Sequence, residues 1–282
     1  MKKFLIIFSV LFILIGCRDK VKKEQLDFFC GSAVKVPMEE IISNFEKKTG
    51  IKVNVIYSGS GNLLAQMELS KKGDVYLCGS PDYIIIGEKR GLLKKNTDRK
   101  IAYLVPAILT PKGNPKSVKT LEDLTNKGVR VGIGNPETVC LGLYATEIFD
   151  ANNILEKVFP NIVVFAKGCA ATENLVVLGK VDAIIGWKVF KNWNPDKTEL
   201  ILIEPEKIKR LAYVAIAVAE FNKNRYIAEK FINYVLSKDG KVVFKKWGYI
   251  TDEKSAKQYA PEASIGGEYK LPEKYFQLVG KK

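Results

Sequence analysis

The chain has 282 residues, of which 47% are hydrophobic and 27% charged, a composition typical of a soluble globular protein with room for two lobes. Its formal charge of +14 favours an anionic partner. It contains no histidine, which excludes Ser-His-Asp and Cys-His nucleophile sites, zinc sites that need histidine, and histidine acid–base catalysis.

The N-terminus has the pattern of a secretory signal. Lys2 and Lys3 precede the apolar run 4–15, which is too short to span a bilayer, so residues 1–16 are predicted to be a signal peptide. The following LIGC resembles the bacterial lipobox, which implies lipid attachment at Cys17 and a polar tether over 17–25. An uncleaved anchor and an ordinary signal remain alternatives. Each places the protein outside the cytoplasm, in the periplasm or at the cell surface, where a nucleic-acid partner fits poorly.

Strands and helices alternate in the first part of the chain. Residues 26–30 are predicted to form a strand, and 36–50 form a helix whose apolar side chains recur at i, i+3, i+4 and i+7. A strand at 51–57 leads into Ser58-Gly59-Ser60-Gly61, a helix follows at once, and 73–79 form the next strand. This order predicts a parallel sheet.

A second α/β unit follows. The apolar run 101–110 is predicted to be one buried strand that leaves the first unit, and 211–220 a strand that returns to it. Between them, strand–turn–helix patterns recur up to a last strand at 181–187. We therefore expect two lobes: lobe 1 comprises 26–106 plus 205–282, and lobe 2 comprises 107–204.

Four turns follow predicted strands, two in each lobe. In open parallel sheets, ligands bind at the carboxyl ends of the strands, where helix N-termini converge. Backbone N–H groups and hydroxyls at such places hold anions without a countercharge. The pattern predicts an anion site formed by the turns at 30–33, 58–62, 135–141 and 170–174.

Four stretches together carry a family resemblance: 28–53, 57–80, 129–145 and 173–187, which include SGSGNLLAQ and GNPE. They resemble the extracytoplasmic solute-binding proteins of ABC importers, in the molybdate/tungstate group. The resemblance implies the periplasmic-binding-protein type II fold, with two Rossmann-like α/β lobes and a hinge of crossing strands. It also implies a monomer without catalytic residues or a cofactor, which delivers a tetrahedral oxyanion to a membrane permease.

The resemblance also implies how the anion is held. Ser60 matches a hydroxyl ligand, Leu141 and Asn174 match backbone N–H donors, and Trp187 stands where the family often has a tyrosine. The first-loop serine of many members aligns with Ala33, so the contact there comes from the Ser32 hydroxyl or the Ala33 N–H. The complete expected ligand set is Ser32, Ala33, Ser58, Gly59, Ser60, Cys140, Leu141, Asn174 and Trp187.

Fully deprotonated molybdate, tungstate and sulfate only accept hydrogen bonds. Phosphate keeps a proton, which it can donate to a carboxylate in its site. Glu137 and Glu173 lie beside the candidate turns, and we interpret both as helix-dipole partners or first-turn caps. Sulfate, phosphate and a sensor role in place of transport remain alternatives. The S-x-x-K at 32–35 and the K-T-G at 48–50 match penicillin-recognising enzymes by chance, because the order is wrong and S-D-N is absent.

The other four cysteines fall at predicted strand ends or in the loops just after them. No C-x-x-C spacing occurs, so a redox or zinc motif is unsupported. They form either one disulfide in each lobe, Cys30–Cys78 and Cys140–Cys169, or buried free thiols. A third reading is a pocket lined by thiols for a soft metal or a thio-anion.

Overall fold

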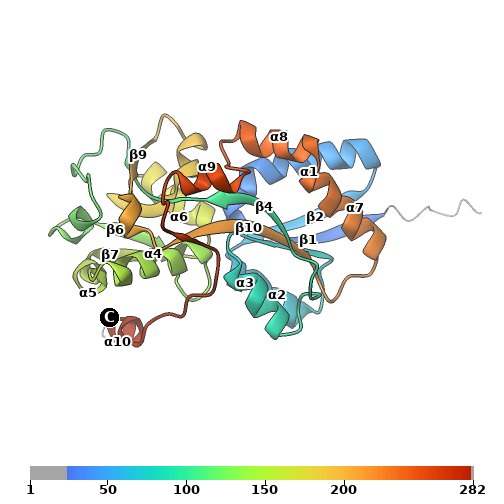
Figure 1. Cartoon of the computed structure of the whole chain (residues 1–282), viewed down its shortest axis with the longest axis horizontal. Helices are drawn as coiled ribbons and strands as arrows, with labels where there is room; N and C mark the ends of the chain where they lie inside the picture. The colour runs from blue at the N-terminus through green and yellow to red at the C-terminus, as the bar shows by residue number, and fades with distance from the viewer. Residues whose placement is uncertain (1–23, 281–282) are drawn as a thin grey trace, which may run out of the picture.

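The computed structural model describes residues 24–280 and contains two sheets flanked by helices (Figure 1). This is the predicted α/β fold. The predicted signal peptide and Cys17 lie outside the described residues. Within the described part, no helix is long and apolar enough to cross a membrane.

The first sheet has the order β11-β10-β3-β1-β2, with β4 also paired to β10. Strands β1, β2 and β3 are parallel, while β10 runs antiparallel to β3 and β4. We call this sheet with its helices lobe 1. Its strands are β1 (Gln25–Gly31), β2 (Lys52–Ser58), β3 (Val75–Cys78), β4 (Arg99–Leu104), β10 (Arg210–Val218) and β11 (Ser264–Ile265).

Helices cover both faces of this sheet: α1, α7 and α8 gather on one side and α2 and α3 on the other (Figure 1). The helices of this part are η1 (Ser32–Val34), α1 (Lys35–Thr49), α2 (Ser60–Ser70), α3 (Asp82–Lys89), η5 (Pro205–Lys207), α7 (Arg225–Leu236), α8 (Lys238–Lys246) and α9 (Glu253–Lys257).

The second sheet has the order β7-β6-β8-β5-β9, and we call it with its helices lobe 2. Strands β6, β7 and β8 are parallel, and β5 is antiparallel to β8 and β9. Its strands are β5 (Pro106–Pro111), β6 (Val131–Gly134), β7 (Ile162–Ala166), β8 (Ala183–Trp187) and β9 (Thr198–Leu202). Its helices are η2 (Glu122–Thr125), α4 (Cys140–Ala151), α5 (Leu155–Val158), η3 (Phe159–Asn161), α6 (Cys169–Val177) and η4 (Lys188–Asn192). The last helix of the chain, α10 (Glu273–Gly280), lies beside α4 and α5 at the second sheet, where Lys274 pairs with Asp150 (Figure 1).

The chain passes between the sheets twice. The single strand expected over 101–110 is two strands in different sheets, β4 in the first and β5 in the second, with Val105 between them. Pro106 is the first residue of β5, a position where proline is tolerated although it has no N–H to donate to a neighbouring strand. The return runs from β9 to β10. The limit expected at 106/107 lies one residue inside β5, and the limit expected at 204/205 lies between β9 and β10.

Aromatic packing fixes α1 and α7 on the first sheet. Helix α1 buries Met38, Ile41 and Phe45 on one face and ends at Gly50, whose φ of +71° suits glycine. The Phe231 ring of α7 lies 5.1 Å, centroid to centroid, from both Phe28 of β1 and Phe45, in edge-on contact each time. One ring therefore joins two helices to a central strand.

Replacing Phe231 by Ala should lower the free energy of unfolding by about 3–5 kcal/mol, because a fully buried ring leaves a cavity. Urea unfolding followed by circular dichroism measures this. Tyr226→Ala on the same helix is the control: its side chain is 69% exposed, and a change beyond about 0.5 kcal/mol is not expected. Equal effects of the two changes would contradict this role of the ring.

Candidate functional site

Three helices begin at the boundary between the lobes. Helix α2 of lobe 1 starts at Ser60, and helices α4 and α6 of lobe 2 start at Cys140 and Cys169. None of the three has a hydrogen bond from its N-cap side chain. The first N–H groups of a helix lack intrahelical acceptors and carry partial positive charge, so these ends together favour an acceptor-rich ligand.

Two glycines allow the loops before these helices to approach one another. A Cβ on Gly59 would lie 2.8 Å from the carbonyl oxygen of Thr138 in lobe 2. A Cβ on Gly168 would lie 2.9 Å from the hydroxyl oxygen of Ser32 in lobe 1. A larger residue at position 59 would meet backbone and push the lobes apart, whereas one at position 168 would first displace the Ser32 hydroxyl.

Hydrogen bonds join the loops directly across the boundary. The Gly61 N–H donates to the Thr138 carbonyl at 2.9 Å, and the Asn62 side-chain amide donates to the Lys167 carbonyl at 3.1 Å. The Ala170 N–H, in the first turn of α6, points to the Ser32 hydroxyl oxygen at 3.4 Å. The structure is therefore a closed arrangement of the lobes.

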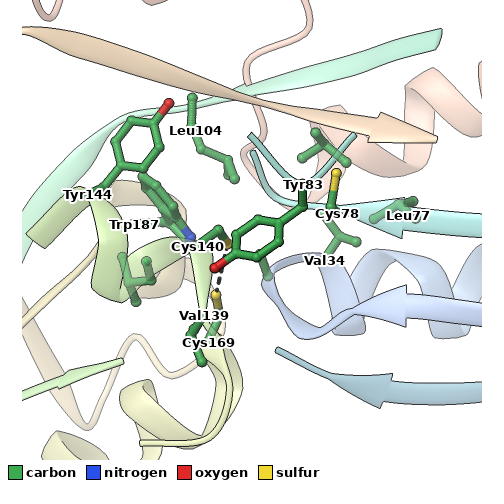
Figure 2. Close-up of a cluster of buried hydrophobic side chains, with 14 of the residues drawn as sticks. Val34, Leu77, Cys78, Tyr83, Leu104, Val139, Cys140, Tyr144, Cys169 and Trp187 are labelled. Atoms are coloured by element: carbon green, nitrogen blue, oxygen red, sulfur yellow. Dashed lines mark hydrogen bonds between the residues drawn. The ribbon is translucent and has the colours of Figure 1, made fainter. Parts of the chain in front are cut away.

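Two buried donors at this boundary have no strong acceptor. In the described part of the chain the Ser60 hydroxyl and the Trp187 indole N–H donate to no oxygen or nitrogen, and only weakly accepting thiol sulfurs lie beside them, Cys140 beside Ser60 and Cys169 beside Trp187. The two residues are 1% and 0% exposed. Figure 2 shows the indole nitrogen on the side of Cys140. A buried donor without a partner costs about 1–3 kcal/mol, so its retention calls for an explanation such as a ligand.

Two thiols lie beside these donors. The sulfurs of Cys140 and Cys169 are 3.6 Å apart and buried (Figure 2). A hydrogen bond between the two thiols lowers the pKa of Cys140, with help from the Ser60 hydroxyl and the Leu141 N–H, while burial opposes it. Burial raises the pKa of Cys169 well above its usual value.

All four described cysteines are buried free thiols. The structure therefore shows the free-thiol alternative and not the two disulfides. Cys78 points its sulfur at the Ser80 carbonyl at 3.0 Å. Cys30 is buried in lobe 1, and burial raises its pKa well above the usual value. Only the pair in lobe 2 lies sulfur to sulfur.

The two carboxylates beside the predicted turns are engaged elsewhere or exposed. Glu173 is buried, accepts a 2.6 Å hydrogen bond from the Asn194 side chain, and has its pKa raised by burial. Glu137 lies on the surface.

A buried ion network near the site joins the lobes. Arg210 of β10, 6% exposed, donates to both carboxylate oxygens of Asp82 in lobe 1 at 3.0 Å. It also donates to Glu147 in lobe 2 at 2.7 Å and stacks its guanidinium 4.3 Å from the Tyr144 ring centroid. One cation thus holds a carboxylate from each lobe.

Most of the expected ligand residues lie at this boundary. Ser32, Ser58, Gly59 and Ser60 come from lobe 1, and Cys140, Leu141 and Trp187 come from lobe 2. Ala33 is buried beside them, and its carbonyl accepts a 2.6 Å bond from the Tyr249 hydroxyl. The Ser32 hydroxyl faces the Ala170 N–H.

Asn174 is a correction, because it does not lie with the others. The predicted turn at 170–174 is helix: α6 begins at Cys169, so Asn174 is its sixth residue and is exposed. An N–H that deep in a helix bonds to the preceding turn. The first N–H groups of this helix end belong to residues 169–171, and that of Ala170 points to the Ser32 hydroxyl.

Sequence reasoning placed Cys169 at a predicted strand end but left it out of the expected ligand set, and it missed Tyr83. Cys169 follows Gly168, the kind of glycine that precedes a close approach, and this signal was available. Tyr83 of α3 directs its hydroxyl toward Cys140 and Cys169 (Figure 2), and nothing in the sequence indicated it.

The architecture, with loops of two α/β lobes closing over a site at helix N-termini, defines a bilobed binding protein. Residues 26–250 match the model of the bacterial extracellular solute-binding proteins, and the chain belongs to that family. Proteins of this family serve ABC transporters as binding components and are not enzymes.

Individual relatives differ in their named ligands. The chain is 24% identical over 264 residues to YvgL of Bacillus subtilis, provisionally named as an ABC transporter substrate-binding lipoprotein, covering 89% of this chain and 99% of the relative. It is 20% identical over 231 residues to the molybdate-binding protein ModA of Escherichia coli, covering 80% and 88%. The solved sulfate-binding protein SubI of Mycobacterium tuberculosis superposes with a TM-score of 0.73 at 14% identity, covering 86% and 94%.

Replacing Arg210 by Met should lower the free energy of unfolding by about 3–5 kcal/mol, because two buried carboxylates lose their cation. Urea unfolding at neutral pH measures the change. Arg90→Met, which removes an exposed pair with Glu68, should cost at most about 1 kcal/mol. A loss for Arg210→Met no greater than this control would show that the network does not hold the lobes together.

Proposed function

We propose that the protein binds a tetrahedral oxyanion, molybdate or tungstate, between its lobes and hands it to an ABC permease. The observation that carries the proposal is the pair of unpartnered buried donors, Ser60 and Trp187, beside three uncapped helix ends. A dianion that only accepts hydrogen bonds satisfies these groups.

The charges around the site support a deprotonated anion over phosphate. Glu173 is bonded to Asn194, and Asp82 is bonded to Arg210, so neither is a free acceptor for a ligand proton. Family membership and the named ligand of ModA support an inorganic oxyanion. Sulfate is the second candidate, because the fold is shared with SubI.

Binding and release require the lobes to separate. The ligand contacts donors of both lobes, Ser60 from lobe 1 and Leu141 and Trp187 from lobe 2, so it stabilises the closed state over the open one. We propose that lipid attachment at Cys17 holds the protein on the extracytoplasmic face of the membrane that contains the permease. We also propose that the protein acts as a monomer.

Replacing Ser60 by Ala should weaken molybdate or tungstate binding by about 1–3 kcal/mol, because one donor to the anion is lost. The free protein should lose little stability, since the hydroxyl has only a weak acceptor, the Cys140 sulfur, there. Calorimetry on the full-length chain in detergent, titrated with molybdate, tungstate, sulfate and phosphate, measures the affinities.

Ser70→Ala, at the exposed end of the same helix, is the matched control and should bind as the unchanged chain does. Unchanged affinity in Ser60→Ala would remove this hydroxyl from the site. If the unchanged chain binds sulfate and neither metal oxyanion, the second candidate replaces the first.

A further inference from the structure

The two thiol sulfurs lie close enough together to bind the same atom. Cys140 and Cys169 are the first residues of α4 and α6, and their sulfurs are 3.6 Å apart. Two sulfurs bonded to one pyramidal or tetrahedral centre at bond lengths of about 2.3 Å lie roughly 3.4–3.8 Å apart. Both cysteines come from lobe 2, so this spacing does not depend on how the lobes close.

The surroundings of the pair disfavour a bare metal cation. Three helix N-termini present partial positive charge there. Across residues 24–280, no group of three or more His, Cys, Asp or Glu side chains is arranged to hold a metal ion. Thiolates select soft elements, so the ligand needs a thiophilic centre without a full positive charge.

The free donors indicate that the same ligand carries oxygen. The Ser60 hydroxyl and the Trp187 indole N–H are buried beside the thiols and donate to no oxygen of the described chain. Both are hydrogen-bond donors, and an oxygen on the thiophilic centre is the acceptor they lack. The two thiols and the two donors therefore fit one small molecule.

We propose that Cys140 and Cys169 form a dithiol site for trivalent arsenic hydroxide, whose remaining oxygen accepts hydrogen bonds from Ser60 and Trp187. The inference rests on the proposal above that the ligand lies between the lobes, and it extends the ligand class from oxyanions to thiophilic oxyacids.

The chemistry is a condensation without oxidation. Arsenic hydroxide has three As–OH bonds. Each thiol forms one As–S bond, its proton passes to a departing hydroxide, and one water leaves each time. The product has two As–S bonds and one As–OH, two waters are released, and arsenic stays trivalent.

Arsenite titration of the full-length chain in detergent, reduced and then freed of reductant, tests the inference. One arsenite per chain is expected, and Cys140→Ser and Cys169→Ser should each weaken binding on the order of 100-fold, because the second bond of a chelate is lost. Cys30→Ser is the matched control: it removes an equally buried thiol that is not paired with another, and arsenite affinity should stay unchanged.

X-ray absorption at the arsenic edge of the unchanged chain decides the case even if a variant fails to fold. Two sulfur neighbours and one oxygen are expected. An oxygen-only shell, no arsenite binding, or wild-type affinity in both serine variants would overturn the inference.

A parallel molybdate titration separates the two proposals. Molybdate binding with no arsenite binding would overturn the dithiol site and leave the oxyanion proposal standing. Arsenite binding without molybdate, tungstate or sulfate binding would support the dithiol site and overturn the oxyanion proposal.

Discussion

The structure depends on the meeting of three uncapped helix ends at one boundary. No side chain of an N-cap residue satisfies the first N–H groups of these helices, and groups of the opposite lobe take some of them, as the Thr138 carbonyl takes the Gly61 N–H. The close approach of the lobes requires glycine at position 59, where a Cβ would meet the Thr138 backbone. The boundary is thereby rich in donors, and the site's preference for acceptors follows from backbone geometry more than from charged side chains.

A buried ion network adds a second constraint on how the lobes close. Asp82, Arg210 and Glu147 bring two negative charges and one positive charge into the closed junction. The C-terminal segment completes this network, because the Gly267 carbonyl accepts from Arg210 and the Tyr269 N–H donates to Asp82. The Tyr269 hydroxyl also reaches Asp150 of lobe 2 at 3.1 Å. The segment therefore ties both lobes at the edge of the site, and its contacts must loosen when the lobes open.

Local patterns in the sequence predicted the elements well. The i, i+3, i+4, i+7 pattern and Gly50 indicated helix α1, and alternating strand and helix patterns indicated the parallel strands β1, β2 and β3, although antiparallel strands make both sheets mixed. The run 101–110 was misjudged as one strand because its apolar character is continuous, although Pro106 marks the point where the chain changes sheets. Asn174 was assigned to a turn because the start of α6 carries no capping side chain to mark it.

Contacts between distant residues lay beyond sequence reasoning. Arg210 meets Asp82 across 128 positions and Glu147 across 63, and no local pattern pairs them. The four cysteines were recognised at strand ends, but only the fold shows that Cys140 and Cys169 touch while Cys30 and Cys78 do not pair. The hydroxyl of Ser60 was expected from family resemblance, and its burial without a partner adds a physical reason for its presence.

The central claim is that an oxyanion lies at the three helix ends between the lobes. The most direct measurement is a crystal structure of the chain grown with tungstate, with the tungsten located by its anomalous scattering. The account predicts one strong peak within contact of the Ser60 hydroxyl, the Leu141 N–H and the Trp187 indole. A peak elsewhere on the molecule, or none in crystals whose lobes are closed, would contradict it.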